Sequence, residues 1–257
     1  MGRGMRLIVN ADDYGVSERA VESTALVFAS GAITSATAMV FCTASPNAAR
    51  VAMESKMPVG LHLNLTDLFS SEDAPSESRR RQAAVAKRMI ARAWTRYVWW
   101  PDLAADVDAT ISDQLQEFRS LFSQSPTHLD GHHHIHLATN VLLSRTLGNF
   151  SAVRLPFSTE GWSRGLAATS VRGVQREYIQ RRFRTTERFY SLQQFVEHHE
   201  TIWASMNWRG DQAVEVECHP ESEDDHRVLG SAKWRHILER YEHHSYDTLA
   251  KATHDVS

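Results

Sequence analysis

The sequence predicts an α/β fold in which parallel strands alternate with helices, in the form of a (β/α) barrel of the TIM type. Strand candidates along the 257 residues are separated mainly by helices. Polar residues follow several of these strands, and a barrel collects its catalytic groups at the carboxyl ends of its strands. The pattern Gly-x-Gly-x-x-Gly of dinucleotide-binding sheets does not occur. We therefore prefer a barrel to a doubly wound sheet.

The first predicted unit is a strand, a polar turn and a helix. Residues 7–9 form a short apolar run. Ser17 is suited to cap a helix that ends near Gly31. The elements predicted next are a strand at 33–41, a helix at 46–56 and a strand at 58–66.

The alternation continues after residue 100. The helices predicted there lie at 102–124, from about 139, at 192–206 and at 224–243. The strands predicted there lie at 126–130, 152–157 and 213–218. Together these elements predict one domain over residues 1–257.

Residues 70–101 fit this alternation poorly and are expected to form an insert. A polar, acidic stretch at 70–78 indicates a loop, and residues 79–100 carry basic side chains without an acidic one. On a helix, Arg88, Arg92 and Arg96 would share one face opposite an apolar face. We favour a solvated helix packed on the barrel. A substrate lid and peripheral contact with an anionic membrane surface are the alternatives.

Three tryptophans in the same segment, Trp94, Trp99 and Trp100, allow several roles. Their rings could stack on sugar faces, but packing in the core or a contact in a homodimer is at least as well supported. A second basic stretch at 172–188 has a similar ambiguity. The sequence leaves the roles of both stretches open.

Composition excludes some classes of function. The chain has 28 Lys and Arg against 31 Asp and Glu, a formal net charge of −3. Nonspecific nucleic-acid binding needs many unpaired basic side chains, so we expect no nucleic-acid partner. No stretch approaches the roughly 18 apolar residues of a membrane span. Cys42 and Cys218 define no disulfide framework, which favours a reducing, cytoplasmic location.

Histidine is the unusual feature of the composition. The chain has 14, and they are dense between Thr127 and His136. Imidazole is a common metal ligand and proton-transfer group, whereas packed imidazoles offer no structural advantage over other polar groups. Spacing leaves the ligands open, because His132, His134 and His136 share a face on a strand but only His132 and His136 share one on a helix. The stretch predicts a metal site without naming its ligands.

Further candidates lie at other strand ends. Asp12 and Asp13 follow the first strand, where one could hold an ion and the other accept a proton, or both could only cap a helix. His62 interrupts an alternating strand and, taken alone, is more often a core residue than a ligand. His219 is placed to donate a proton or polarise an oxyanion, or is only a polar strand end. Cys218 should point the opposite way, as a buried thiol.

Five segments occur in the order seen in one known family. They are LIVNADDYG at 7–15, GLHLNLT at 60–66, PTHLDGHHHIH at 126–136, VRLP at 153–156 and ECHP at 217–220. Over residues 6–220 the chain resembles the YdjC-like carbohydrate deacetylases, which include chitooligosaccharide deacetylase and the hopanoid-associated deacetylases. The His-rich block and the Asp-Asp turn are specific together, and each alone is only suggestive. The chain departs from the family pattern directly after His136 and at Glu221, where Gly is usual.

The resemblance implies a distorted (β/α) barrel related to polysaccharide deacetylases. It implies a hydrolase that removes an acetyl group from an N-acetylated sugar, either chitooligosaccharide-like or glycolipid-linked. It also implies one divalent metal ion, Mg or Zn, and mixed His and carboxylate ligands permit Mn, Co or Ni as well. Because the insert at 70–101 falls where we expect the family to vary, the identity of the sugar does not transfer.

The resemblance also implies a role for each site residue. The expected metal ligands are Asp13, His62 and His132. The expected general base is Asp12, and the expected general acid is His219. The residues expected to steady the base, contact substrate or support the site are Arg154, Asp130, His134 and His136.

Two other functions remain as alternatives. A metal-dependent phosphoesterase would use the basic segments to attract phosphate and would release phosphate rather than acetate. A non-catalytic His-rich metal-binding protein would hold several ions and would not need Asp12. The spread of polar groups over separate strand ends favours a deacetylase.

Overall fold

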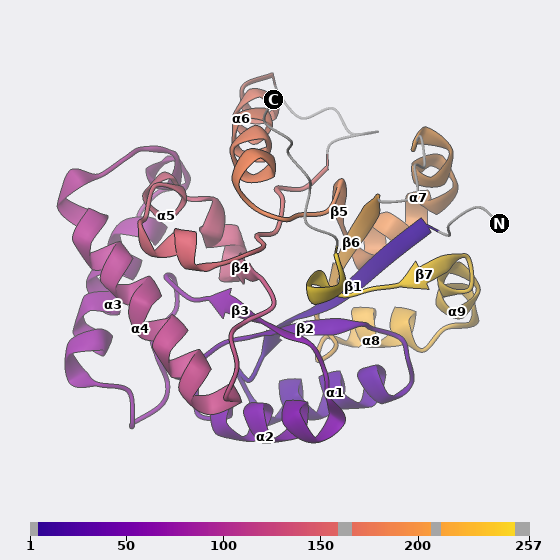
Figure 1. Cartoon of the computed structure of the whole chain (residues 1–257), viewed down its shortest axis with the longest axis horizontal. Helices are drawn as coiled ribbons and strands as arrows, with labels where there is room; N and C mark the ends of the chain where they lie inside the picture. Colours follow the sequence, from indigo (N-terminus) through magenta and orange to yellow (C-terminus); the bar gives the residue numbers. More distant parts are fainter. Residues whose placement is uncertain (1–4, 159–165, 207–211, 250–257) are drawn as a thin grey trace.

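One curled parallel sheet forms the centre of the structure (Figure 1). The computed structural model describes residues 5–158, 166–206 and 212–249. The strand order is β4-β3-β2-β1-β6-β5, and β7 pairs with β1. The strands are β1 (Met5–Tyr14), β2 (Ser35–Ala38), β3 (Val59–Leu63), β4 (Leu129–Gly131), β5 (Arg188–Ser191), β6 (Ala213–Cys218) and β7 (Tyr241–His243). The predicted fold class, a distorted α/β barrel, is confirmed.

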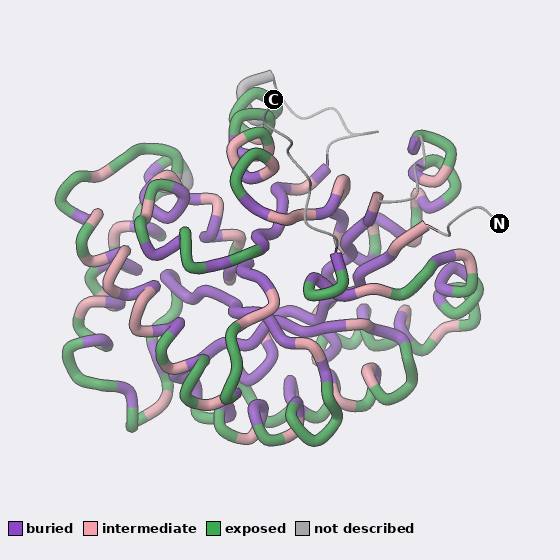
Figure 2. Tube along the Cα trace, viewed as in Figure 1, coloured by how far each residue is buried: buried purple, intermediate pink, exposed green. Residues whose placement is uncertain are grey.

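Helices surround this sheet, and Figure 2 shows buried strands inside a rim of exposed helix surfaces. The α-helices are α1 (Glu18–Ala29), α2 (Ser45–Ser55), α3 (Ser76–Ile90), α4 (Ala104–Phe122), α5 (Thr139–Leu142), α6 (Leu166–Arg182), α7 (Leu192–Ser205), α8 (Glu223–Leu229) and α9 (Ala232–Leu238). The 3₁₀ helices are η1 (Ala93–Tyr97), η2 (Pro101–Leu103), η3 (His132–Leu137), η4 (Thr146–Asn149) and η5 (Tyr246–Thr248). Across the described ranges, no helix has the length and apolar character needed to cross a membrane.

Alternate residues of β1 face opposite sides of the sheet. Leu7 and Val9 join the main apolar core, which the helices complete. Ile8 packs instead in a small separate cluster on the inner side. Further along the same inner side, Asn10 and Asp12 are buried and hydrogen-bonded to each other. The inner side of β1 therefore changes from apolar to polar towards its carboxyl end.

An extended segment at 152–158 spans the space between β4 and β5. The Arg154 amide donates to the Leu129 carbonyl oxygen at 3.0 Å, and the Ser158 amide donates to the Phe189 carbonyl oxygen at 2.9 Å. Isolated bridges, rather than a regular ladder, join this segment to its neighbours. The strand predicted at 152–157 is therefore extended but irregular. The segment brings the Arg154 side chain into the barrel interior.

The prediction of one helix over residues 224–243 is wrong. Two short helices, α8 and α9, lie on either side of residues 230–231, and the chain then forms β7. The Ser231 hydroxyl accepts a hydrogen bond from the Trp234 amide and caps α9, so a new helix begins directly after Gly230. A helix does begin at residue 139, as predicted, but this helix, α5, is short and covers only Thr139–Leu142.

The two basic stretches differ from the predicted pattern. The segment at 79–100 is not one helix, because α3 ends at Ile90 and Arg92 has an extended backbone before η1. The stretch at 172–188 runs into β5, which the sequence analysis missed. Phe189 and Tyr190 are both buried in this four-residue strand, so no alternation was available to reveal it.

The close packing of β3 against the chain leading into β4 leaves no room for a side chain at Gly60. A Cβ at this position would lie 2.5 Å from His128 Nδ1 and 2.8 Å from the His128 carbonyl oxygen, so backbone as well as side chain would have to move. We expect Gly60→Ala to lower the free energy of unfolding by about 1–3 kcal/mol, measured by chemical denaturation. Gly148→Ala is the matched control, because nothing lies within 4 Å of its added Cβ. Equal losses in the two variants would contradict this packing.

Candidate active site

The two aspartates near the end of β1 contact different groups. Pairing with β2 is irregular at this point, and Asp13 has a left-handed backbone with a φ of 57°. The Asp12 carboxylate contacts Arg154 in the barrel interior. The Asp13 carboxylate contacts His62 and His132. Adjacent carboxylates therefore occupy separate environments, as a division of labour between them would require.

Asp13, His62 and His132 form a compact group of donor atoms. Asp13 Oδ1 lies 3.1 Å from His62 Nε2 and 2.8 Å from His132 Nδ1. Ligands about 2 Å from one ion in a tetrahedral site are roughly 3–3.5 Å apart, so a small outward shift would admit a cation. Two imidazoles and one carboxylate also match the chemistry of divalent metal sites. The side chains present therefore fit the expected metal ion.

Asp130 supports His62 from behind. The side-chain pair is buried, with His62 Nδ1 2.8 Å from Asp130 Oδ1. A carboxylate on the second ring nitrogen is the usual way to fix the orientation of a metal-binding imidazole. Burial opposes a charged ring, but Asp130 and Asp13 outweigh it and raise the pKa of His62 well above its usual value. The surroundings of His62 therefore favour positive charge at this place.

The His-rich turn sends its side chains in different directions. His133 and His134 have left-handed backbones, with φ of 51° and 54°, so neither the strand nor the helix spacing applies. The His133 ring lies against Thr66, with Nδ1 3.3 Å from Oγ1. His134 packs edge-on against Phe157 at a centroid distance of 4.6 Å. The turn thus brings His132 alone of its residues into the group with Asp13 and His62.

His134 and His136 are held as neutral rings. Burial lowers the pKa of His134 to about 4 and that of His136 to about 3. Within the described ranges, neither ring nitrogen of His136 has a hydrogen-bond partner. His134 Nε2 lies 3.9 Å from Glu217, so this residue faces the polar interior. Both residues adjoin the predicted ligands without joining them.

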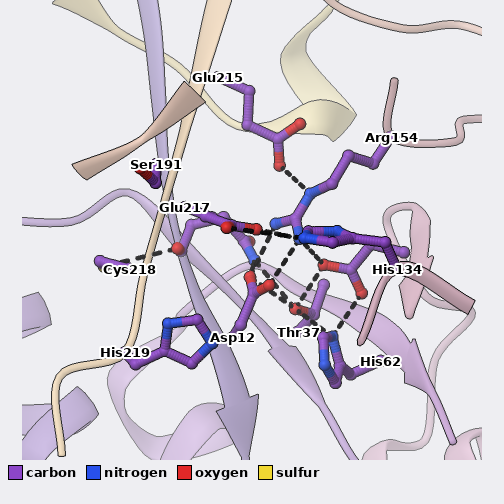
Figure 3. A network of polar contacts seen from close by, with 12 residues as sticks. Asp12, Thr37, His62, His134, Arg154, Ser191, Glu215, Glu217, Cys218 and His219 are labelled. Atoms are coloured by element: carbon purple, nitrogen blue, oxygen red, sulfur yellow. Dashed lines mark hydrogen bonds and ion pairs between the residues drawn. The ribbon is translucent and has the colours of Figure 1, made fainter. Parts of the chain in front are cut away.

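Arg154 is the central cation of the barrel interior (Figure 3). Its two terminal nitrogens donate to Asp12, at 2.6 Å to Oδ2 and 2.7 Å to Oδ1. The same guanidinium lies 2.7 Å from Asp130 and 2.8 Å from Glu215. Burial opposes ionisation of Asp12, but Arg154 outweighs it and lowers the pKa of that carboxyl. Arg154 therefore fixes the position of the Asp12 carboxylate.

Glu215 and Glu217 are site residues that the sequence analysis did not single out. They alternate with Val214, Val216 and Cys218 along β6, so both acids face the barrel interior. Burial raises the pKa of Glu215 to about 7 and that of Glu217 well above its usual value. The alternation was visible in the sequence. The missing signal was the arginine that the acids face, which lies on a different segment.

His219 lies at the mouth of the site, directly after β6. Its side chain is 40% exposed, and its Nε2 lies 3.8 Å from Asp13 Oδ2. Asp225 lies behind it, accepting a hydrogen bond from the His219 amide at 2.7 Å and lying 3.9 Å from its Nδ1. Asp225 is a further residue that the sequence did not reveal. Cys218 is buried, and its thiol faces the Asn10 carbonyl oxygen, as expected for a structural cysteine.

Asp67 is a fourth acidic residue missed by sequence reasoning. Its Oδ2 lies 3.3 Å from His132 Nε2, on the side of the ring away from Asp13. Asp67, His132 and His133 form a second group of neighbouring donor atoms. Because an acid in a polar loop is common, its position after β3 carried no specific signal.

A cleft of about 420 Å³ adjoins the His-rich turn. His133 and His134 form one wall, and Pro156 and Phe157 contribute from the extended segment. The other lining residues come from η1, from the end of η3 and the residue after it, and from α6: Arg96, Tyr97, Leu137, Ala138, Val171, Arg172 and Gln175. Within the described ranges no acidic residue lines it. The charged side chains of its described lining, Arg96 and Arg172, are therefore both cationic.

A sequence profile described as YdjC-like protein matches residues 6–252. The chain belongs to the YdjC-like family. Relatives include carbohydrate deacetylase of Homo sapiens, which is 36% identical over 143 residues, or 53% of this chain and 43% of that protein. Chitooligosaccharide deacetylase of Yersinia enterocolitica is 28% identical over 223 residues, or 83% of this chain and 81% of that protein.

The comparison with solved structures concerns the fold. A crystal structure of an Enterococcus faecalis V583 protein, named for cellobiose-phosphate cleavage, superposes with a TM-score of 0.68 at 18% identity. The superposition covers 96% of this chain and 100% of that one. The sequence match with the carbohydrate deacetylases of mouse, human and Geobacillus stearothermophilus spans about half the length of those proteins. The crystal structure thus shares the fold of this chain over nearly its whole length.

The contact between Asp130 and His62 predicts a change in metal affinity. We expect Asp130→Asn to weaken the binding of a divalent ion by about 10–100-fold, because an amide orients and charges the His62 ring less well. Titration calorimetry with Zn²⁺ would measure this. Asp113→Asn is the matched control, because the partly buried Asp113 pairs with Arg81 between α3 and α4 and contacts none of the proposed ligands. If a folded Asp130→Asn protein bound Zn²⁺ as tightly as the parent, the idea that Asp130 orients His62 for metal binding would be wrong.

The raised pKa of Glu215 predicts a pH dependence of stability. Below about pH 4.5 the carboxyl is protonated in both folded and unfolded states, and burial has no ionic cost. Between that pH and about 7, where its folded pKa lies, the unfolded state loses its proton first, so Glu215 lowers stability as pH rises. We expect Glu215→Gln to have a smaller loss of melting temperature between about pH 5 and about pH 8 than the parent. Parallel melting curves for the two proteins would contradict this assignment.

Proposed function

We propose that this YdjC-like protein is a metal-dependent hydrolase that removes the acetyl group from an N-acetylated sugar. The observation that carries the proposal is the convergence of Asp13, His62 and His132 beside an Arg-held carboxylate, Asp12. The names of the carbohydrate and chitooligosaccharide deacetylases to which the chain is similar support the same chemistry. The sugar is chitooligosaccharide-like or glycolipid-linked.

We assign Asp13, His62 and His132 as the residues that would hold the metal ion. A divalent ion bound there would polarise the acetamide carbonyl and lower the pKa of a water. Two imidazole ligands favour Zn²⁺, Co²⁺ or Ni²⁺ over Mg²⁺, which prefers oxygen ligands. Asp130 would keep the His62 ring in the orientation that directs Nε2 to the site.

Asp12 is assigned as the general base. Its Oδ1 accepts hydrogen bonds from Asn10 and Arg154. Among the described residues, Oδ2 accepts a hydrogen bond of normal length only from Arg154. A carboxylate oxygen has two lone pairs, so Oδ2 can accept one more proton. Arg154 keeps the carboxylate ionised and fixed in direction. A base that is already oriented needs no rearrangement when it receives the proton of a water.

His219 is assigned as the general acid. It is the half-exposed member of the site, so its Nε2 can reach a leaving group that returns to solvent. Water adds to the acetamide carbon, the carbon–nitrogen bond breaks, and a proton from His219 completes the departing amine. Asp225 accepts the His219 amide hydrogen bond and lies behind Nδ1, so it holds the ring at the mouth of the site. The products are acetate and a free amino sugar.

Acetate release from N-acetylchitooligosaccharides tests the proposal. We expect activity in the metal-loaded protein, loss after chelation, and a fall in kcat of about 10²-fold or more for Asp12→Asn, because the base is removed. Asp102→Asn at the surface is the matched control. Asp12→Asn should still bind Zn²⁺, which separates loss of the base from loss of the site.

Two results would contradict the proposal. Full activity of Asp12→Asn would remove Asp12 from the mechanism. Release of phosphate from sugar phosphates, with no acetate from any N-acetylated sugar, would favour the phosphoesterase. Arg96 and Arg172 in the lining of the cleft are the feature that such an enzyme would use.

A further inference from the structure

The segment at 90–99 displays an apolar and aromatic surface. Trp94, Tyr97 and Trp99 are 49%, 56% and 51% exposed, and Ile90 and Val98 are also exposed. We call these five side chains the aromatic patch. Single exposed apolar residues are ordinary, but a group of them on the surface marks an interaction site. The patch follows α3 directly and belongs to the insert whose role the sequence left open.

The patch is held in place by buried polar anchors. The Thr95 hydroxyl is buried and donates to the Arg92 carbonyl oxygen at 2.6 Å. Trp100 exchanges two hydrogen bonds with the Asn140 amide, at 2.9 and 2.8 Å, and its indole donates to the Thr95 carbonyl oxygen at 3.0 Å. The backbone is thus fixed while the neighbouring rings remain outside. The exposed position of these rings therefore follows from the fixed backbone of the segment.

The patch borders the cleft beside the His-rich turn. Tyr97 lines that cleft together with Val171, another exposed apolar residue on α6. On its other side, Trp99 lines a second cleft with the exposed side chains of Leu143 and Arg145. Apolar surface therefore continues from the patch on both sides. The cleft beside the His-rich turn is therefore bordered by this apolar surface.

Positive charge accompanies the patch. Lys87, Arg92 and Arg145 are exposed near it, and no acidic residue occurs between residues 78 and 101 of the sequence. Two acids do approach, one from η2 and one from α4. Asp102 pairs with Arg88 at 2.6 Å, and Asp108 accepts hydrogen bonds from Ser144 and Thr146. The local excess of positive charge contrasts with a chain that is slightly acidic as a whole.

We propose that the aromatic patch and its flanking cations dock this protein on an anionic membrane surface. Tryptophan and tyrosine favour the boundary between lipid chains and headgroups, and each basic side chain near an anionic leaflet adds attraction. A second copy of the chain fits less well, because a two-fold contact through the patch would place like charges of both copies opposite each other. On the proposed function, docking would present a lipid-linked N-acetylated sugar to the cleft.

Flotation of the whole chain with lipid vesicles tests the proposal. We expect binding to vesicles of phosphatidylcholine with phosphatidylglycerol, and far less to phosphatidylcholine alone. The double variant Trp94→Ala/Trp99→Ala should lower the partition coefficient by about tenfold or more, because two rings no longer enter the interface. Arg92→Gln/Arg145→Gln should weaken binding to the anionic vesicles, and added salt should do the same to the parent.

The matched control is Leu26→Ala/Met53→Ala, which removes two exposed apolar side chains from α1 and α2 at the bottom of Figure 1. It should float like the parent, and thermal unfolding should show that all variants are folded. Equal flotation of the aromatic and control variants, or no flotation of the parent, would overturn the proposal. A parent dimer that the Trp94→Ala/Trp99→Ala change dissociates would assign the patch to a second copy. Acetate release from a soluble substrate is measured separately, so failure of docking and failure of the proposed activity are distinguishable.

Discussion

A single buried guanidinium determines how the inside of this barrel is arranged. Arg154 is fully buried, and three carboxylates lie within 2.8 Å of it: Asp12, Asp130 and Glu215. Removing one partner from such a group leaves a charge unpaired in a dry interior, which costs about 3–5 kcal/mol. Because Asp130 also contacts His62, the guanidinium positions the proposed base directly and a proposed metal ligand through one intermediate. The segment at 152–158 forms no regular ladder, and its structural role is to place Arg154 among these acids.

The fold was predictable where local pattern and tertiary structure agree. The strands β1, β3 and β6 and the helices α1, α2, α4 and α7 lie where apolar spacing and caps place them. The failures have local causes. β5 buries two adjacent aromatic residues and shows no alternation, and Ser231 begins a new helix inside an apparently continuous one. Strand 152–157 lacks a ladder because its partners are set by closure of the barrel, which no short window of sequence encodes.

The site was predictable as a set of strand ends but not as a set of contacts. Asp13, His62 and His132 are far apart in the sequence, and only the parallel order of β1, β2, β3 and β4 brings them together. The supporting acids were harder to see. Asp225 has no distinctive spacing, and Glu217, although it alternates along β6, gains its relevance only from Arg154, which it faces. Likewise, spacing could not distinguish His132 from His134 and His136, because left-handed backbones within the turn break every regular period.

The protonation of the interior acids connects the guanidinium to the proposed ion. Glu217, and Glu215 below about pH 7, are neutral in their buried positions, whereas Asp12, Asp13 and Asp130 are ionised. Asp12 and Asp130 face the positive charge of Arg154, whereas Asp13 lies against His62 and His132, and Asp130 and Asp13 raise the pKa of His62. A divalent cation would take the place of the positive charge that these acids favour on His62 and leave the ring neutral, as a ligand must be. The electrostatic balance of the whole barrel interior, and not the three ligands alone, therefore suits one doubly charged ion at Asp13, His62 and His132.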